Sequence, residues 1–447
     1  MYLHTFGPAV MYMGAIVATL LSIIRNPRIG LYFLVPLLPM QTARYWLHAY
    51  PMGEKMVDVV LLGVLIGLLI HGKKPVFIAS PLNKLILIFC VLTLLGLWEG
   101  SLLQDLPLPI SYLDPRFSNW KNYVEMMLIF FVAAAALRTP KQMIIILVLV
   151  SASVLMVNRS YHSTVGGRDY SQYSDQLREA GPLGYAGENG MGAFEAQMAV
   201  FLLGLSTFSR RKLVRMALWT TALTSIYCLV FTFSRGGYLG FLVGILVLGL
   251  IRERKLLLML AVLLVVWESI VPDAVRDRVF MTYQEGQLDA SAVERIAIWQ
   301  DALDVITHNP VLGRGFDTYE FMGRVGLYRD THNYYLKIIL ELGLVGLFFF
   351  LWMITSACQM SWQLFRTASD PTLRAVGCAL FATLMCAAVV NLFGDRWSYL
   401  QVNGFLWVFM GMAARGLWLI RREGEQPEAA DLPTGIESSD MAEVVSA

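Results

Sequence analysis

The sequence has few charged residues and few cysteines for its length, and each shortage excludes classes of protein. Only 15% of its 447 residues are Asp, Glu, Lys or Arg, whereas 57% are hydrophobic. Such a composition excludes an ordinary soluble globular protein. The five cysteines all lie within apolar runs and have no paired spacing, so they indicate neither a disulfide framework nor a thiolate metal site.

Several motifs of metal- and nucleotide-dependent chemistry are absent as well. The sequence has no HExxH, no P-loop, no serine elbow and no carboxylate pair with metal-ligand spacing. Metal-dependent and nucleotide-driven mechanisms are therefore disfavoured, and we expect no cofactor. The first apolar run has no basic segment before it and no small-residue cleavage site after it, which indicates a retained helix rather than a signal peptide.

The sequence does contain a long series of apolar runs, many of them close to the roughly 20 residues that cross a bilayer as a helix. They lack the alternation of a membrane barrel, so helices are expected. We predict an all-α polytopic membrane protein with about 12–13 transmembrane helices (range 12–14), in which the short second run could be half of a hairpin. The runs fall at about 8–24, 29–41, 56–70, 82–98, 121–137, 142–157, 191–208, 214–233, 236–251, 256–271, 334–356, 374–393 and 401–420.

Lysine and arginine clusters in the short loops fall on one side if the spans alternate, and this side is expected to be cytoplasmic. Long segments then lie on the opposite, outer side. The predicted organisation is N-terminal transmembrane helices (1–157), an outer segment (158–190), central transmembrane helices (191–271), a large outer loop containing helices (272–333), C-terminal transmembrane helices (334–420) and a disordered cytoplasmic tail (421–447).

The large outer loop contains the signature of an amphipathic helix. Ser291 and Glu294 form a capping-box pattern, and apolar residues follow at helical spacing from Ile296. We therefore predict a helix at about 292–307 that lies against the membrane face.

The outer side is rich in arginine. Its planar guanidinium matches phosphate oxygens in pairs, so these side chains suggest an anionic ligand such as a phosphate or pyrophosphate. For most of them the simpler interpretation is that long translocated loops carry charge regardless of topology. The arginines assigned to this side are Arg159, Arg168, Arg178, Arg235, Arg276, Arg278, Arg295, Arg314, Arg324, Arg329 and Arg396.

Two residues stand out as candidates for chemistry. Arg235 lies in a short hairpin between two apolar runs, where a charge is costly and by default suggests function, although it could also reach lipid headgroups. His332 follows Arg329 and Asp330 at the start of an apolar run, and histidine can accept a proton near neutral pH. A histidine in such a position is otherwise often a helix cap.

Charged residues near His332 raise further alternatives. Lys337 and Glu341 are four residues apart and could simply pair, but two charges in a membrane helix also suggest a cavity. Asp395 could orient His332 or Arg235, or could pair with Arg396. Gly343 and Gly346 would permit close helix packing.

The motifs together resemble the O-antigen ligase and polymerase superfamily over about residues 178–420. The resemblance rests on Ser234-Arg235-Gly236-Gly237, on the loop sequence from Asn309 to Gly315, on His332-Asn333, and on Glu341-x-Gly343-x-x-Gly346. It implies a bacterial inner-membrane glycosyltransferase that acts at the periplasmic face and has a cytoplasmic C-terminus.

The resemblance also implies what such an enzyme acts on. It would move a glycan from undecaprenyl pyrophosphate to an acceptor hydroxyl, most simply on lipid A-core oligosaccharide in lipopolysaccharide biosynthesis, by metal-independent direct displacement. Lipid-linked donor, glycan acceptor and membrane lipids are the expected partners, and no nucleic acid is expected. The resemblance implies catalytic roles for His332, Arg235 and Asp395, and binding roles for Arg178, Asn189, Arg314, Arg324, Arg329 and Arg396.

Alternatives remain open at this point. A repeat-unit polymerase or a protein O-oligosaccharyltransferase of the same superfamily would differ in the acceptor. A secondary transporter could line a pathway with Lys337, Glu341, Glu195 and Arg235. A transporter should have inverted repeats and broken helices near the bilayer midplane, and the sequence indicates neither.

Overall fold

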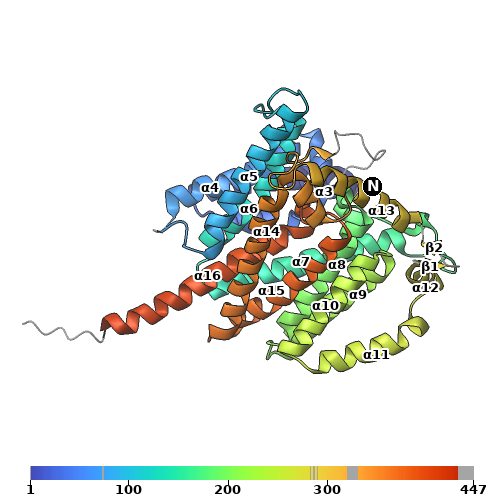
Figure 1. Ribbon diagram of the computed structural model, residues 1–447. Coiled ribbons are helices and arrows are strands. Elements are labelled where there is room, and N and C mark those ends of the chain that lie inside the picture. Colours follow the sequence, from blue (N-terminus) through green and yellow to red (C-terminus); the bar gives the residue numbers. More distant parts are fainter. Residues whose placement is uncertain are drawn as a thin grey trace, which may run out of the picture.

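The computed structural model describes residues 2–72, 75–281, 283–284, 287–288, 290–319 and 331–430. It is almost entirely helical (Figure 1) and confirms the all-α polytopic fold. The helices are α1 Tyr2–Ile24, α2 Arg28–Leu34, α3 Gln41–Tyr45, α4 Met56–His71, α5 Pro81–Leu103, α6 Pro115–Ala136, α7 Pro140–Val165, α8 Gly187–Ser206, α9 Lys212–Phe231, α10 Arg235–Ile251, α11 Lys255–Ile270, α12 Asp273–Phe280, α13 Ala290–His308, α14 Tyr334–Thr367, α15 Pro371–Val390 and α16 Leu400–Ala430.

Short elements join these helices. The strands β1 Tyr283–Gln284 and β2 Gln287–Leu288 form a small antiparallel pair in the large outer loop. In the described residues the connections also contain the 3₁₀ helices η1 Val35–Leu37, η2 Trp46–Ala49, η3 Gly53–Lys55, η4 Asp175–Leu177, η5 Gly181–Ala186 and η7 Asn391–Phe393.

Several helices begin at the same local signal, a capping side chain followed by proline. Ser80, Asp114, Thr139 and Asp370 each accept a hydrogen bond from a backbone N–H in the first turn of α5, α6, α7 and α15. Each is followed by a proline, which has no N–H to leave unpaired at the first helical position. These starts are therefore determined by sequence that is local to each helix.

Fewer helices pass a length and composition test for crossing a membrane than the number of spans predicted. In the described residues, seven helices are long and apolar enough to cross a membrane, or eight if α11 and α12, which meet at a bend of 111°, form one span. Other predicted runs form helices that are too short or too polar for this test. α4 has 16 residues and α10 has 17, and α6 begins with several polar residues. The second run forms α2 and η1 and ends at Leu37, so the segment Arg28–Leu37 is too short for the same test.

Some predicted boundaries also shift. α7 continues to Val165 and α8 starts at Gly187, so the outer connection is shorter than 158–190. α16 extends through Ala430, so the first ten residues of the predicted disordered tail are helical, and residues 431–447 lie outside the described chain. The amphipathic helix expected at 292–307 is α13, Ala290–His308, which confirms the helix, whereas its position against the membrane face stays a prediction.

The core forms around α8, which lies among α9, α10, α15 and α16 (Figure 1). Every residue of α8 from Gly190 to Ser206 is buried. A helix that is buried on all faces must be surrounded by other helices rather than by lipid. Phe201 of α8 stacks on Phe409 of α16 at 3.7 Å between ring centroids. The start of α8 is therefore held in a fixed position, and the candidate site is built around it.

Candidate functional site

Arg295 of α13 is the centre of a group of positive charges. Arg178, Arg235, Arg278 and Arg396 all lie close enough to act on it electrostatically, and burial together with these four charges lowers the pKa of Arg295. The ordinary pKa of arginine is far above neutrality, so the guanidinium keeps its charge. We call these five residues the arginine cluster. They come from five separate segments of the chain. Arg235, Arg278 and Arg295 lie in α10, α12 and α13, whereas Arg178 follows η4 and Arg396 lies in the turn before α16.

Arg178 is fixed against the first turn of α8. Its Nη2 donates to Asn189 Oδ1 at 2.9 Å, and its Nη1 lies 3.4 Å from Glu188 Oε1. Arg178 and Asn189, for which the resemblance implies binding roles, are thus in direct contact. Glu188 offsets part of the positive charge, and the role of the pair in binding remains a prediction.

Arg396 reaches the same region from the turn that precedes α16. Its side chain is 7% exposed, and its Nη1 donates to the Ala186 carbonyl at 3.4 Å. Its backbone N–H donates to Asn391 Oδ1 at 3.1 Å. This turn is therefore anchored to the residue just before α8, next to the Arg178 contact.

Arg278 is buried as well, with 8% of its side chain exposed. Its guanidinium lies over the ring of Tyr173, 4.8 Å from the ring centroid. Tyr173 in turn packs against Phe233 with ring centroids 5.4 Å apart. This aromatic chain connects α12 to the hairpin that precedes Arg235.

Arg235 is the first residue of α10, in a tightly packed hairpin. Ser234 caps the helix by accepting from the Gly237 N–H at 3.3 Å. Phe233, two residues before Arg235, has a left-handed backbone (φ 53°), which costs a non-glycine residue about 1–2 kcal/mol. A Cβ on Gly236 would lie 2.8 Å from Phe393. Gly236 therefore permits close approach, and the group that approaches is the Phe393 side chain of the protein itself.

His332 lies just before α14, and it is not the helix cap. Asn333 has that role, because its Oδ1 accepts from the Leu336 N–H at 3.2 Å. His332 itself has a left-handed backbone (φ 49°), a conformation that is uncommon for a non-glycine residue. Trp299 of α13 donates from Nε1 to the Thr331 carbonyl at 2.9 Å. Trp299 lies one turn after Arg295, so α13 positions both the arginine cluster and the segment that carries His332.

Asp395 pairs with Lys337, an arrangement outside the three alternatives weighed for it. Lys337 Nζ lies 2.8 Å from Asp395 Oδ2 and 3.9 Å from Glu341 Oε1. Burial on its own would raise the pKa of Asp395, but Lys337 and a hydrogen bond from the Ser398 N–H outweigh it, so the pKa lies below the ordinary value. The pair connects the start of α14 to the turn that carries Arg396.

The motif loop at 309–315 has a backbone role. α14 is broken at Gly343, which has φ 63° and ψ −167°. Such a break frees carbonyl and N–H groups that need partners inside a membrane protein. The loop supplies partners for four of these backbone groups. The N–H groups of Arg314 and Gly315 donate to Leu340 and Glu341 at 2.9 Å each, and the Pro310 and Val311 carbonyls accept from Leu344 and Val345 at 2.9 and 3.2 Å.

The break corrects two expectations. Gly343 does not serve helix-to-helix packing, because a Cβ there would lie 2.1 Å from the Val311 carbonyl oxygen of the inserted loop. The expected absence of broken helices, which was used against a transporter, is wrong. The loop itself fills this break, however, so the freed backbone groups are used within the protein.

The remaining predicted binding residues separate from the arginine cluster or cannot be placed. Arg314 is held by its backbone at the α14 break. Arg324 and Arg329 lie outside the described residues. Two members of the cluster, Arg278 and Arg295, were not predicted as site residues. The position of Arg295 one turn before Trp299 on an amphipathic helix is the signal that could have indicated it.

These observations define a multi-pass membrane protein in which five arginines lie near one another, two of them buried, and in which α13 also contacts the segment that carries His332. A family model described as O-antigen ligase matches residues 220–351, so this part of the chain is similar to the O-antigen ligase and Wzy-like superfamily. The matched region includes Arg235, Arg278, Arg295 and His332. The match supports glycan transfer by a glycosyltransferase-type enzyme in general. No curated protein matches the chain.

Proposed function

We propose that this protein transfers a glycan from undecaprenyl pyrophosphate to an acceptor hydroxyl, most simply on lipid A-core oligosaccharide, at the periplasmic face of the inner membrane. The observation that carries this proposal is the convergence of five arginines from five segments. Like charges held together repel one another, and an anionic ligand offsets that repulsion. A pyrophosphate offers several oxygens that guanidinium groups bind in pairs.

The cluster suits the leaving group of such a reaction. As the bond between the anomeric carbon and the phosphate oxygen breaks, its electron pair leaves with the pyrophosphate. Fixed donors that face this developing charge lower the barrier, and removal of one such donor typically costs about 10²–10³ in rate. Arg235 adds the favourable field of the N-terminus of α10 to its own charge.

His332 is the candidate base. In a direct displacement the acceptor oxygen forms a bond to the anomeric carbon on the side opposite the pyrophosphate, and the hydroxyl proton passes to the base. Histidine suits this step because it titrates near neutral pH. A single displacement inverts the anomeric configuration. We propose Asp395 as a positioning residue, because its contact is with Lys337.

The test uses purified protein, a purified undecaprenyl-pyrophosphate-linked donor and lipid A-core acceptor, with a chelator present. We expect transfer by the wild type, with inversion, and losses of about 10²–10³ for Arg235→Ala. We expect a comparable loss for His332→Ala. Arg276→Ala is the matched control, because Arg276 lies on α12 beside Arg278 but pairs with Asp273 at the surface.

Analysis of the reaction product identifies the acceptor. Growth of the donor glycan without transfer to lipid A-core would identify a polymerase, and transfer to a protein side chain would identify a protein O-oligosaccharyltransferase. Transfer that needs a divalent cation would contradict the metal-independent mechanism. Absence of glycan turnover with every acceptor would overturn the proposal and favour transport.

A further inference from the structure

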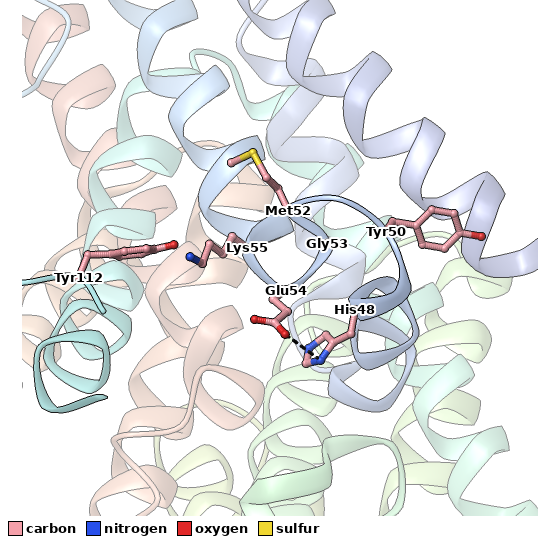
Figure 2. A pocket seen from close by; sticks show the side chains of 7 residues that line it. All are labelled: His48, Tyr50, Met52, Gly53, Glu54, Lys55 and Tyr112. Atoms are coloured by element: carbon pink, nitrogen blue, oxygen red, sulfur yellow. Dashed lines mark ion pairs between the residues drawn. The ribbon is translucent and has the colours of Figure 1, made fainter. Parts of the chain in front are cut away.

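A polar cavity lies in the N-terminal third of the chain, outside the region that matches the family model. It has a volume of about 380 Å³. Figure 2 shows its walls: Lys55 points toward Tyr112, and the Glu54 carboxylate faces the His48 ring. The lining residues are His48, Tyr50, Met52, Gly53, Glu54, Lys55 and Tyr112.

We place the cavity on the same face of the protein as the arginine cluster, because hydrogen bonds connect the segment just before it to that cluster. Gln41 of α3, a few residues before His48, accepts at Oε1 from the Tyr185 N–H of η5 at 2.9 Å. The carbonyl of Ala186, the next residue, accepts from Arg396. A short chain of contacts therefore runs from the segment that forms the cavity to the arginine cluster.

The loop that forms the cavity is held rigidly. A Cβ on Gly53 would lie 1.7 Å from the Leu47 carbonyl oxygen, so only glycine fits there. Tyr12 of α1 stacks on Tyr50 with ring centroids 4.8 Å apart, and its hydroxyl donates to the Pro51 carbonyl at 3.0 Å. A site that is already formed before binding loses little free energy on ordering.

The chemistry of the walls favours a hydroxylated ligand over an apolar one. Lys55 Nζ lies 3.6 Å from the Tyr112 ring centroid, and among the described residues no carboxylate pairs with it. His48 Nδ1 lies 3.5 Å from Glu54 Oε1, and both side chains are substantially exposed. An apolar ligand would leave these groups unpaired as it displaced their water. A sugar offers hydroxyls to the charged groups and a C–H face to the aromatic ring.

We propose that this cavity is a saccharide-binding subsite, which holds sugar units of the acceptor glycan while its reacting hydroxyl lies at the arginine cluster. The choice of ligand class rests in part on the proposed function, because a glycan must be bound on this face during transfer. The volume lies within the roughly 300–1,000 Å³ of small-molecule sites.

Binding is tested separately from transfer. The full-length protein is purified in lipid nanodiscs, and saturation-transfer NMR is recorded with core oligosaccharide released from its lipid. We expect signals from the sugar protons with wild type. We expect Tyr112→Ala and Lys55→Met to weaken binding about tenfold or more, and Lys55→Arg to restore part of it. Leu113→Ala is the matched control, because Leu113 is adjacent to Tyr112 but is 85% exposed and does not line the cavity.

Arg235→Ala separates this proposal from the proposed function. If it loses transfer but keeps oligosaccharide binding, both proposals are supported. Wild-type binding that survives Tyr112→Ala and Lys55→Met, or the absence of binding by wild type, would overturn the subsite whatever the transfer assay gives. A protein that binds the oligosaccharide through Tyr112 and Lys55 but transfers no glycan would support the subsite and overturn the proposed function.

Discussion

Two regions of this molecule contain glycine and arginine motifs that look alike in the sequence, but the motif has a different role in each region. In the hairpin at Ser234–Gly237, close packing brings the Arg235 side chain into a cluster of five guanidinium groups. In the loop at 309–315, the backbone completes the hydrogen bonds of a broken membrane helix. An arginine within a glycine-rich motif is therefore not by itself evidence of ligand binding, and its neighbours in space decide its role.

The largest effect is expected at the α14 break. Gly343→Ala would place a Cβ 2.1 Å from the Val311 carbonyl oxygen at a left-handed φ. The loop would have to withdraw and leave four backbone hydrogen bonds unmade, at about 1–3 kcal/mol each. We expect little folded protein, measured by yield and apparent Tm in detergent. Gly167→Ala is the control, because Gly167 has φ 78° but open space around it. Equal Tm values for the two variants would show that the loop contact is not essential.

The next effect on stability is expected for the ion pair between Lys337 and Asp395, which connects the start of α14 to the turn that carries Arg396. Lys337→Met leaves Asp395 buried without its partner, and loss of one member of a buried ion pair typically costs about 3–5 kcal/mol. The variant Lys337→Met with Asp395→Leu should be more stable than Lys337→Met alone, because no charge remains unpaired. Stability is measured by chemical denaturation. Additive losses in the double variant would mean that the pair contributes no coupling.

A smaller effect, on the rate of glycan transfer, should distinguish an arginine of the cluster from the arginine of the loop at 309–315. Arg295→Ala removes the central member of the arginine cluster, and we expect glycan transfer to fall about 10²-fold. Arg314→Ala leaves the backbone bonds of its loop in place, so transfer should fall less than about tenfold, which is about 1.4 kcal/mol. Initial transfer rates decide the comparison. A greater loss for Arg314→Ala would restore the binding role that the sequence motif implies.

The smallest effect concerns pH. The pKa of Asp395 is lowered in the folded protein, so its contribution to stability is present above its unfolded pKa and is lost as pH falls through the folded value. The difference in apparent Tm between wild type and Asp395→Asn should therefore stay constant from about pH 8 to 5 and shrink only below about pH 4. A difference that already shrinks near pH 6 would contradict the ion pair.

The sequence by itself determined the features that depend on neighbouring residues. Apolar runs specified helices, capping residues followed by proline specified several helix starts, and the amphipathic pattern specified α13 to within two residues. The resemblance to a known family also pointed to Arg178 and Asn189, which are in contact in the structure. Span lengths were less predictable, because polar residues in α6 and the short length of α10 reduce the number of helices that can cross a membrane alone.

Only the tertiary structure decided which distant side chains meet. Arg178 and Arg396 are more than two hundred residues apart, and both reach the start of α8 because several helices pack around it. Lys337 lies closer to Asp395 than to Glu341 because the turn before α16 folds back onto α14. The break at Gly343 exists because a loop some thirty residues earlier supplies its hydrogen bonds. Such partners cannot be predicted from the neighbouring sequence, because each contact depends on how the complete chain packs.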